Sequence, residues 1–174
     1  MRKGRLIFLV VLVGLLVVLN IDAFAKAKIT FVTGTVKYQK SGSEDWLDAA
    51  KDLELSDKDT IKTGKFSNVE LEFPEENTVK IAQNTVLTVE QIGKDEKSSF
   101  KVESGKVFMQ IKKGDDTNVK TPNAVAGVRG TKFFVEFKDG ETFIFVVEGS
   151  VWVKRLGFDE EKVLNEGQLI NILN

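Results

Sequence analysis

The sequence predicts an all-β protein, because two features recur along its length. Apolar and polar residues alternate with a period of two, as in VELEF at 69–73, and clusters of turn-forming residues, such as KDGE at 138–141, separate the alternating runs. This combination is typical of short strands that bury one face. We expect about a dozen short strands in a double sheet, built as a β-roll, a β-solenoid-like fold or a sandwich.

The individual strands and turns follow from the same pattern. Two runs, 86–89 and 143–147, are apolar on both faces and are expected to be covered on both sides. Asp139-Gly140 tolerates the positive φ angles of a two-residue hairpin, and residues 45–55 have room for one short helical turn. Strict alternation predicts strands at 69–73, 79–81, 107–111 and 133–137. Turns are predicted at 41–43, 63–65, 74–77, 93–95, 113–116 and 138–141.

A Gly-x-Val motif followed by alternating apolar residues occurs three times, starting at Gly34, Gly105 and Gly149. The spacings between the three copies are unequal, so the motif is not a solenoid repeat of fixed period. We interpret it as a recurring corner at which a turn leads into a strand.

The first 25 residues have the parts of a secretory signal peptide. Three basic residues precede an uncharged apolar run at 6–19, and Ala23-Phe24-Ala25 offers a cleavage site. As a helix the run would span about 21 Å, less than the roughly 30 Å of a bilayer core. We expect cleavage after Ala25, with an uncleaved anchor as the alternative. The remaining residues 26–174 are then a single all-β domain that is periplasmic or secreted.

The composition excludes several kinds of chemistry. The chain has no cysteine and no histidine, which excludes disulfides, thiolate zinc sites, a cysteine-linked lipid anchor and Ser-His catalytic triads. The net charge of −1 leaves no basic footprint for nucleic acid or anionic lipid. We therefore expect no cofactor, no nucleic-acid partner, and membrane contact only transiently through the signal peptide.

The stretch TPNAVAGVRGT at 121–131 is the strongest local motif. Its Thr-Pro step predicts extended chain entering a bend, and its glycines permit backbone angles that bulkier residues resist. The candidate site residues are Thr121, Pro122, Ala124, Gly127, Arg129, Gly130 and Thr131.

Two interpretations of this stretch remain open. In the first, Val128-Arg129 is a corner or bulge, and Arg129 is a buried clamp on a carboxylate. In the second, the backbone N–H groups from Gly127 to Gly130 bind an anionic ligand together with Arg129. The first is favoured because no phosphate-loop lysine and no helix follow the stretch. The carboxylates considered as partners are Glu103, Glu136 and Glu148.

The same block resembles the FecR-type periplasmic domain, whose hallmark is Thr-Pro-x-Ala-x-Ala-x-Val-Arg-Gly-Thr followed by Glu-Gly-x-Val, found here within VVEGSVWV at 146–153. The resemblance extends over residues 31–172 and implies an all-β, extracytoplasmic domain. Two family glycines are replaced, by Lys58 and by Asn77, and Asn77 is expected to keep its turn by adopting the left-handed conformation.

In iron-uptake regulators, domains of this type relay the state of an outer-membrane transporter to a cytoplasmic segment that binds a sigma factor. This sequence has no segment of that kind. We therefore expect a free-standing domain, to which the relay function is not carried over.

Two further groups of residues are weak candidates for a site. Acidic clusters at 56–59, 114–116 and 159–161 lack the spacing of an EF-hand and lie in predicted turns, so we interpret them as solvated turns rather than Ca²⁺ sites. The rings of Tyr38, Trp46 and Trp152 are a possible carbohydrate-binding platform. We favour the alternative, in which they cover faces of the sheet.

Three functions remain open at this point. We expect a non-enzymatic binding, scaffolding or signal-input module of the cell envelope, whose partner is an envelope protein or a polysaccharide. A carboxylate-dependent hydrolase of glycans is one alternative, and it requires two acids roughly 5–10 Å apart across a cleft. The other is a relay partner of a separate membrane regulator, which predicts a defined protein partner.

Overall fold

The structure, a computed structural model, describes residues 26–93 and 97–173. The expected signal peptide lies outside this part of the chain. Within it the secondary structure consists of sixteen strands and one 3-10 turn, Pro74–Glu76, which confirms the all-β class. In the same ranges no helix has both the length and the apolar character needed to cross a membrane.

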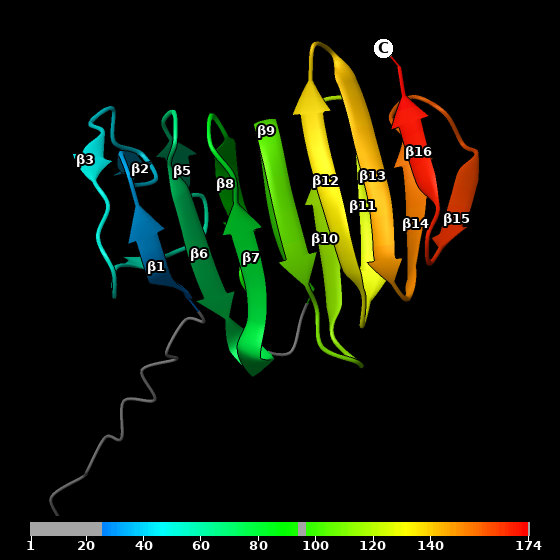
Figure 1. The fold of residues 1–174 in the computed structure, drawn as a ribbon, viewed down its shortest axis with the longest axis horizontal. Helices are drawn as coiled ribbons and strands as arrows, with labels where there is room; N and C mark the ends of the chain where they lie inside the picture. The colour runs from blue at the N-terminus through cyan, green and yellow to red at the C-terminus, as the bar shows by residue number, and fades with distance from the viewer. Residues whose placement is uncertain (1–25, 94–96, 174) are drawn as a thin grey trace, which may run out of the picture.

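The strands form one continuous, open sheet that is folded into two layers (Figure 1). All neighbouring strands in the first layer, layer A, are antiparallel. In order across the layer they are β4 (Glu54–Leu55), β1 (Ala27–Thr33), β6 (Asn68–Phe73), β7 (Asn77–Ile81), the second half of β9 (Ser98–Gln110), β12 (Lys132–Lys138), β13 (Glu141–Glu148) and β16 (Leu169–Ile172).

The second layer, layer B, shares β9 with layer A, and β9 therefore joins the two. Its β9–β10 pair is parallel, while its other described pairs are antiparallel. The chain progresses along the long axis of the molecule, from blue to red in Figure 1. In order across layer B the strands are β3 (Leu47–Asp48), β2 (Val36–Gln39), β5 (Thr60–Thr63), β8 (Val86–Gln91), the first half of β9, β10 (Asp116–Lys120), β11 (Ala124–Arg129), β14 (Ser150–Arg155) and β15 (Glu161–Asn165).

The core lies between the two layers and is built by the predicted alternation. In β6, Val69, Leu71 and Phe73 point inward and are at most 3% exposed. Phe73 of layer A meets Phe100 of layer B edge-on, with 5.0 Å between the ring centroids. Burial of side chains of this size contributes about 1.5–3 kcal/mol each to stability.

The two runs that were expected to be covered on both sides are buried on one side only. In β13, Ile144 and Val146 are buried, but Phe143 and Phe145 on the opposite side are only half-buried. In β8, Leu87 is buried while its neighbour Thr88 is half-buried. The expectation was wrong because the fold has two layers, so each strand faces the core on one side alone.

The recurring Gly-x-Val motif is a corner, as predicted, and the structure shows that the chain passes between the layers there. Gly34 lies between β1 and β2, Gly105 lies where β9 changes layer, and Gly149 lies between β13 and β14. All three glycines have positive φ angles, of 76°, 89° and 89°. A Cβ atom at each would lie 2.4, 2.3 and 3.1 Å from a hydroxyl oxygen of Ser67, Thr85 and Thr131, respectively.

The hydroxyl groups opposite these glycines belong to a second set of corners, and we call each pair a glycine–hydroxyl corner. Ser67, Thr85 and Thr131 are at most 1% exposed, and each forms a hydrogen bond with the residue that follows the glycine. The bonds are Thr35 N–H to Ser67 Oγ (2.8 Å), Lys106 N–H to Thr85 Oγ1 (3.0 Å) and Thr131 Oγ1–H to the Ser150 carbonyl (2.8 Å).

The hairpin turns agree with the sequence in one case and differ in another. Asp139 and Gly140 both have positive φ, of 53° and 84°, which confirms the predicted two-residue hairpin. The expectation for Asn77 was wrong, since its backbone is extended with φ of −71°. The left-handed positions of that turn are Glu75 and Glu76, with φ of 65° and 59°.

Two other local features differ from a simple reading of the sequence. Lys58, which stands where the family has glycine, adopts the left-handed conformation itself, with φ of 66°. The helical turn expected within 45–55 is absent from the described structure. This region forms the two-residue strands β3 and β4, which pair with β2 and β1 and are too short to show alternation.

Substitution at a glycine–hydroxyl corner should be far more destabilising than substitution at an exposed left-handed glycine. In Gly105→Ala, the new Cβ would lie 2.6 Å from Thr85 Cα, so the backbone must move. We expect a loss of about 3 kcal/mol in the free energy of unfolding, measured by urea denaturation.

Gly42→Ala is the matched control, because Gly42 has a φ of 77° but no atom within 4 Å of the added Cβ. It should lose only about 1 kcal/mol, from backbone strain alone. Equal losses for the two variants would show that the corner contact has no energetic role.

Candidate functional site

The first part of the 121–131 stretch ties the two layers together at one edge of the molecule. The Thr121 and Thr142 hydroxyls are 2.7 Å apart, and both residues are at most 3% exposed. The Asn123 amide donates to the carbonyls of Gly140 (3.0 Å) and Ile172 (3.1 Å). Pro122 is exposed at the turn. These buried bonds connect the β10–β11 turn of layer B to β13 and β16 of layer A.

The middle of the stretch is a regular strand rather than a bend. Ala124 contributes to the core at 1% exposure. Gly127 lies inside β11, directly opposite Trp152 of β14. A Cβ atom at Gly127 would lie 2.0 Å from Trp152 Cε2, so this glycine is required because the indole ring lies against its backbone. Gly127 is therefore needed because it leaves space for the indole ring, and not because the chain adopts a special backbone angle there.

The end of the stretch corrects the expectation for Arg129. Val128 and Arg129 are the last two residues of β11, and the corner follows at Gly130, with φ of 67°, and Thr131. The Arg129 side chain is 71% exposed, and its Nε lies 3.7 Å from Asp116 Oδ1. The idea of a buried clamp on Glu103, Glu136 or Glu148 is therefore wrong. Arg129 is the last residue of β11 and its side chain points outward, so the guanidinium group stays in solvent.

The three rings of the proposed carbohydrate platform are not brought together. Tyr38 is partly buried against the core. Trp46 lies under the Lys62 ammonium of β5, 4.2 Å from the ring centroid, whereas Trp152 is on β14. Five strand steps of about 4.8 Å each separate β5 from β14. The prediction that the three rings form a single platform is therefore wrong.

The acidic cluster at 56–59 has a structural role. Asp59, expected in a solvated turn, is 2% exposed. It accepts hydrogen bonds from Lys40 Nζ (2.6 Å) and from the N–H groups of Ser41 and Ser56 (both 2.9 Å). Among the described residues no group of three or more acidic side chains is arranged to hold a metal ion.

The carboxyl groups with shifted pKa values are partners in surface ion pairs. For Glu90, partial burial raises the pKa, but hydrogen bonds from Lys120 and Ser99, with the nearby charges of Lys120 and Lys101, outweigh burial and lower it overall. At three further pairs, hydrogen bonds and attraction from lysine lower the carboxyl pKa: Asp52 with Lys28, Glu54 with Lys26, and Glu76 with Lys112. In the Lys28 and Lys112 pairs the same contacts raise the pKa of the lysine.

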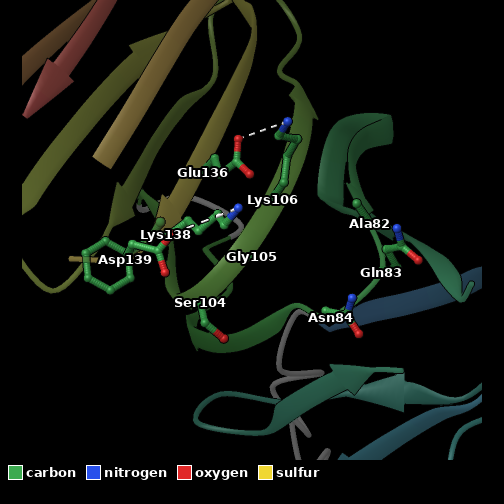
Figure 2. A pocket seen from close by; sticks show the side chains of 10 residues that line it. Ala82, Gln83, Asn84, Ser104, Gly105, Lys106, Glu136, Lys138 and Asp139 are labelled. Atoms are coloured by element: carbon green, nitrogen blue, oxygen red, sulfur yellow. Dashed lines mark ion pairs between the residues drawn. The ribbon is translucent and has the colours of Figure 1, made fainter. Parts of the chain in front are cut away.

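A hollow of about 540 Å³ opens beside the corner at Gly105. Figure 2 shows Glu136 and Lys106 facing each other on one side of it, and the β7–β8 turn with Gln83 on the other. The Lys106 ammonium is 2.9 Å from Glu136, while Asp139 is 4.0 Å from Lys138. Both carboxylates of the hollow thus lie near a lysine, Glu136 in a cross-strand surface pair with Lys106 and Asp139 beside its sequence neighbour Lys138.

Next to this hollow, apolar side chains form a row across the outer face of layer A. Phe108, Phe134, Phe145 and Leu169 occupy directly opposed positions on β9, β12, β13 and β16; we call them the apolar row. The Phe108 and Phe134 rings lie 4.7 Å apart. Phe134 is 37% and Leu169 61% exposed, so the row is open to a partner.

A second hollow, of about 240 Å³, lies along the apolar row. It is lined by Phe134, Phe145 and Leu169 of the row and by Lys106 and Glu136, which also line the first hollow.

Charged pairs frame the apolar row on three sides. Each pair joins neighbouring strands of layer A. The pairs are Lys106–Glu136 (2.9 Å), Lys132–Glu148 (2.5 Å) and Lys80–Glu70 (3.5 Å).

Sequence reasoning missed the apolar row. The only local signal was a phenylalanine in the outward phase of an alternating strand, as at Phe108 between Val107 and Met109, and at Phe134 between Phe133 and Val135. The row becomes visible only when the register between strands far apart in the sequence is known.

Comparison with known proteins finds one matching family and solved structures with the same fold. A family model described as FecR protein matches residues 59–152. Two crystal structures of a "putative anti-sigma factor" from Parabacteroides distasonis ATCC 8503, at 2.50 and 1.65 Å resolution, share the fold with a TM-score of 0.55 and 18% identity. The match covers 66% of this chain but only 59% of theirs. No curated protein matches the sequence.

The contact between Gly127 and Trp152 can be measured with a double-mutant cycle. Gly127→Ala should lower the free energy of unfolding by about 2 kcal/mol, because the methyl group displaces the indole ring. In a Trp152→Ala background the same change should cost little. Chemical denaturation gives the four free energies, and the fluorescence of Trp152 should shift in Gly127→Ala. A similar cost in both backgrounds would contradict the assigned role of Gly127.

Proposed function

Because the chain belongs to the FecR protein family and presents an apolar row framed by ion pairs, we propose that it is an exported, non-catalytic module. In this role it binds a protein partner in the cell envelope and acts as a signal input. The supporting observation is the contrast between an apolar centre and a charged rim on one face. This contrast is the usual anatomy of a protein–protein interface, and contiguous exposed apolar patches mark such sites.

A protein partner is better supported than a polysaccharide. The apolar row consists of phenylalanine and leucine, whereas sugar-binding surfaces use tryptophan and tyrosine, whose polar edges remain in water. Trp46 and Trp152 lie on the opposite layer and far apart, so they do not combine into a sugar site.

A regulatory role through a separate protein fits the comparisons. The description of the solved structures with the same fold names an anti-sigma factor, and we extend to this chain only the idea of a module that reports to another protein. Export rests on the signal-peptide pattern of residues 1–25 and implies a periplasmic or secreted location.

The hydrolase alternative has less support. It would place two working acids in a cleft, and the hollow of Figure 2 contains Glu136 and Asp139. Both carboxylates lie within 4.0 Å of lysine ammonium groups. Glu136 moreover lies directly opposite Lys106 in the β9–β12 ladder, as expected for a structural pair.

Photo-crosslinking in living cells tests the proposed function. A benzophenone amino acid at position 134 should give one discrete protein adduct in the cell envelope, because Phe134 is in the centre of the apolar row. Phe134→Ala should then weaken binding of the identified partner by roughly tenfold or more.

Position 152 provides the matched control, since Trp152 is a half-buried, outward-facing aromatic residue on the other layer. The same probe at position 152 should give no such adduct, and Trp152→Ala should leave binding within about twofold. Equal adducts from both faces, or adducts with cell-wall polymer alone, would contradict the proposal.

A further inference from the structure

Within the described part of the chain, the edge strands of the open sheet differ in how well they are protected. An exposed edge presents unpaired N–H and C=O groups, which proteins normally shield with short strands or charged side chains. The edges β3 and β4 have two residues each and contain Asp48 and Glu54. The edge β15 contains Glu161 and Lys162. By contrast β16, Leu169–Ile172, has no charged residue.

The backbone of β16 is fixed on one side and open on the other. Gly167 N–H donates to the Val146 carbonyl and Val146 N–H to the Gln168 carbonyl, and the ladder with β13 continues from there. Hydrogen bonding in an antiparallel ladder alternates, so Ile170 is bonded to β13. The backbone groups of Leu169 and Asn171 therefore point away from the sheet.

We propose that β16 pairs with β16 of a second copy of this chain, antiparallel about a twofold axis at Asn171. Layer A of one copy and layer A of the other then form one continuous sheet across the dimer. Asn171 lies opposite itself, Leu169 lies opposite the partner's Leu173, and Ile170 lies opposite the partner's Ile172. This pairing goes beyond the proposed function and does not depend on it.

The choice of a second copy rests on the self-complementarity of this register. It places apolar side chains opposite apolar side chains on both faces and brings no like charges together. A register centred one residue earlier, at Ile170, would put Leu169 opposite the partner's Asn171. Leu169 is 61% and Leu173 is 54% exposed in the single chain, so both gain from burial in the Asn171-centred dimer.

The open end of the molecule beside β16 supports the same pairing. A hollow of about 390 Å³ lies there. Its lining combines apolar side chains (Val153, Phe158, Ile170, Ile172 and Leu173) with Asn171 and the charged residues Arg155, Glu160 and Lys162. Phe158 is 52% exposed. Twofold pairing through β16 would bring two such hollows together and remove their apolar walls from water.

Single cysteines test the register directly, because the chain has no cysteine of its own. Opposed residues in a hydrogen-bonded antiparallel pair have Cα atoms about 5.5 Å apart, within the range that a disulfide spans. The Asn171→Cys variant, purified from cells without truncation, should form a covalent dimer under mild oxidation. Leu169→Cys should cross-link with Leu173→Cys in a mixture, but much less with itself.

Val163→Cys on β15 is the control, because Val163 is 63% exposed on the neighbouring edge strand. It should remain monomeric on a non-reducing gel. Sedimentation equilibrium should show a reversible dimer of the cysteine-free chain. Leu169→Lys should raise its dissociation constant about tenfold or more, since a charge then lies opposite an apolar side chain, while Val163→Lys should not.

Two results would overturn the dimer: a chain that stays monomeric at all concentrations, or an Asn171→Cys variant that cross-links no faster than the Val163→Cys variant. The open edge would then be available to a strand from a different protein. Leu169 belongs both to the apolar row and to the paired edge, but position 134 lies on β12, two strands from β16. Adducts there report on the proposed function and disulfides at Asn171→Cys report on the dimer, so the two proposals can fail independently.

Discussion

The rest of the fold depends on how the chain crosses from one layer to the other without leaving buried backbone groups unpaired. At each glycine–hydroxyl corner the glycine has a positive φ and packs closely against a serine or threonine. The hydroxyl group then bonds the backbone of the residue that follows the glycine. The hydroxyl residues are buried, and a buried polar group without a partner costs about 1–3 kcal/mol, so these hydrogen bonds allow the hydroxyls to lie inside tight corners.

The corners also determine which side chains face outward. At Gly105 the strand β9 leaves layer B and enters layer A, which fixes the phase of Val107 and Phe108. Val107 then points to the core, while Phe108 points to solvent beside Phe134. A shift of one residue would exchange these two faces. The apolar row is therefore a consequence of the same geometry that holds the layers together.

The 121–131 stretch is best understood as part of this architecture. Thr121 and Asn123 connect the layers at one edge, Gly127 makes room for Trp152, and Gly130-Thr131 forms a corner. Arg129, by contrast, has no such structural task, since its side chain lies in solvent. The motif identifies the family because it builds the fold, and the surface that we propose for binding lies on other strands.

The sequence predicted the local structure well and the surface poorly. The alternation in 69–73 and the Asp139-Gly140 turn are local properties, and both have their expected structure. The apolar row depends on cross-strand register among β9, β12, β13 and β16, which no local pattern specifies. The burial of Asp59 and the exposure of Arg129 were missed for the same reason, because partners distant in the sequence decide which charged side chain is buried.

The central claim is that the glycine–hydroxyl corners are hydrogen-bonded parts of the core rather than flexible turns. Amide hydrogen exchange measured by NMR tests it directly, since Thr35 and Lys106 donate their N–H groups to the buried hydroxyls of Ser67 and Thr85. We predict that these two amides exchange only through near-global unfolding, with protection similar to that of Leu71 in β6. Exchange as fast as that of the exposed turn at Gly42 would contradict the account.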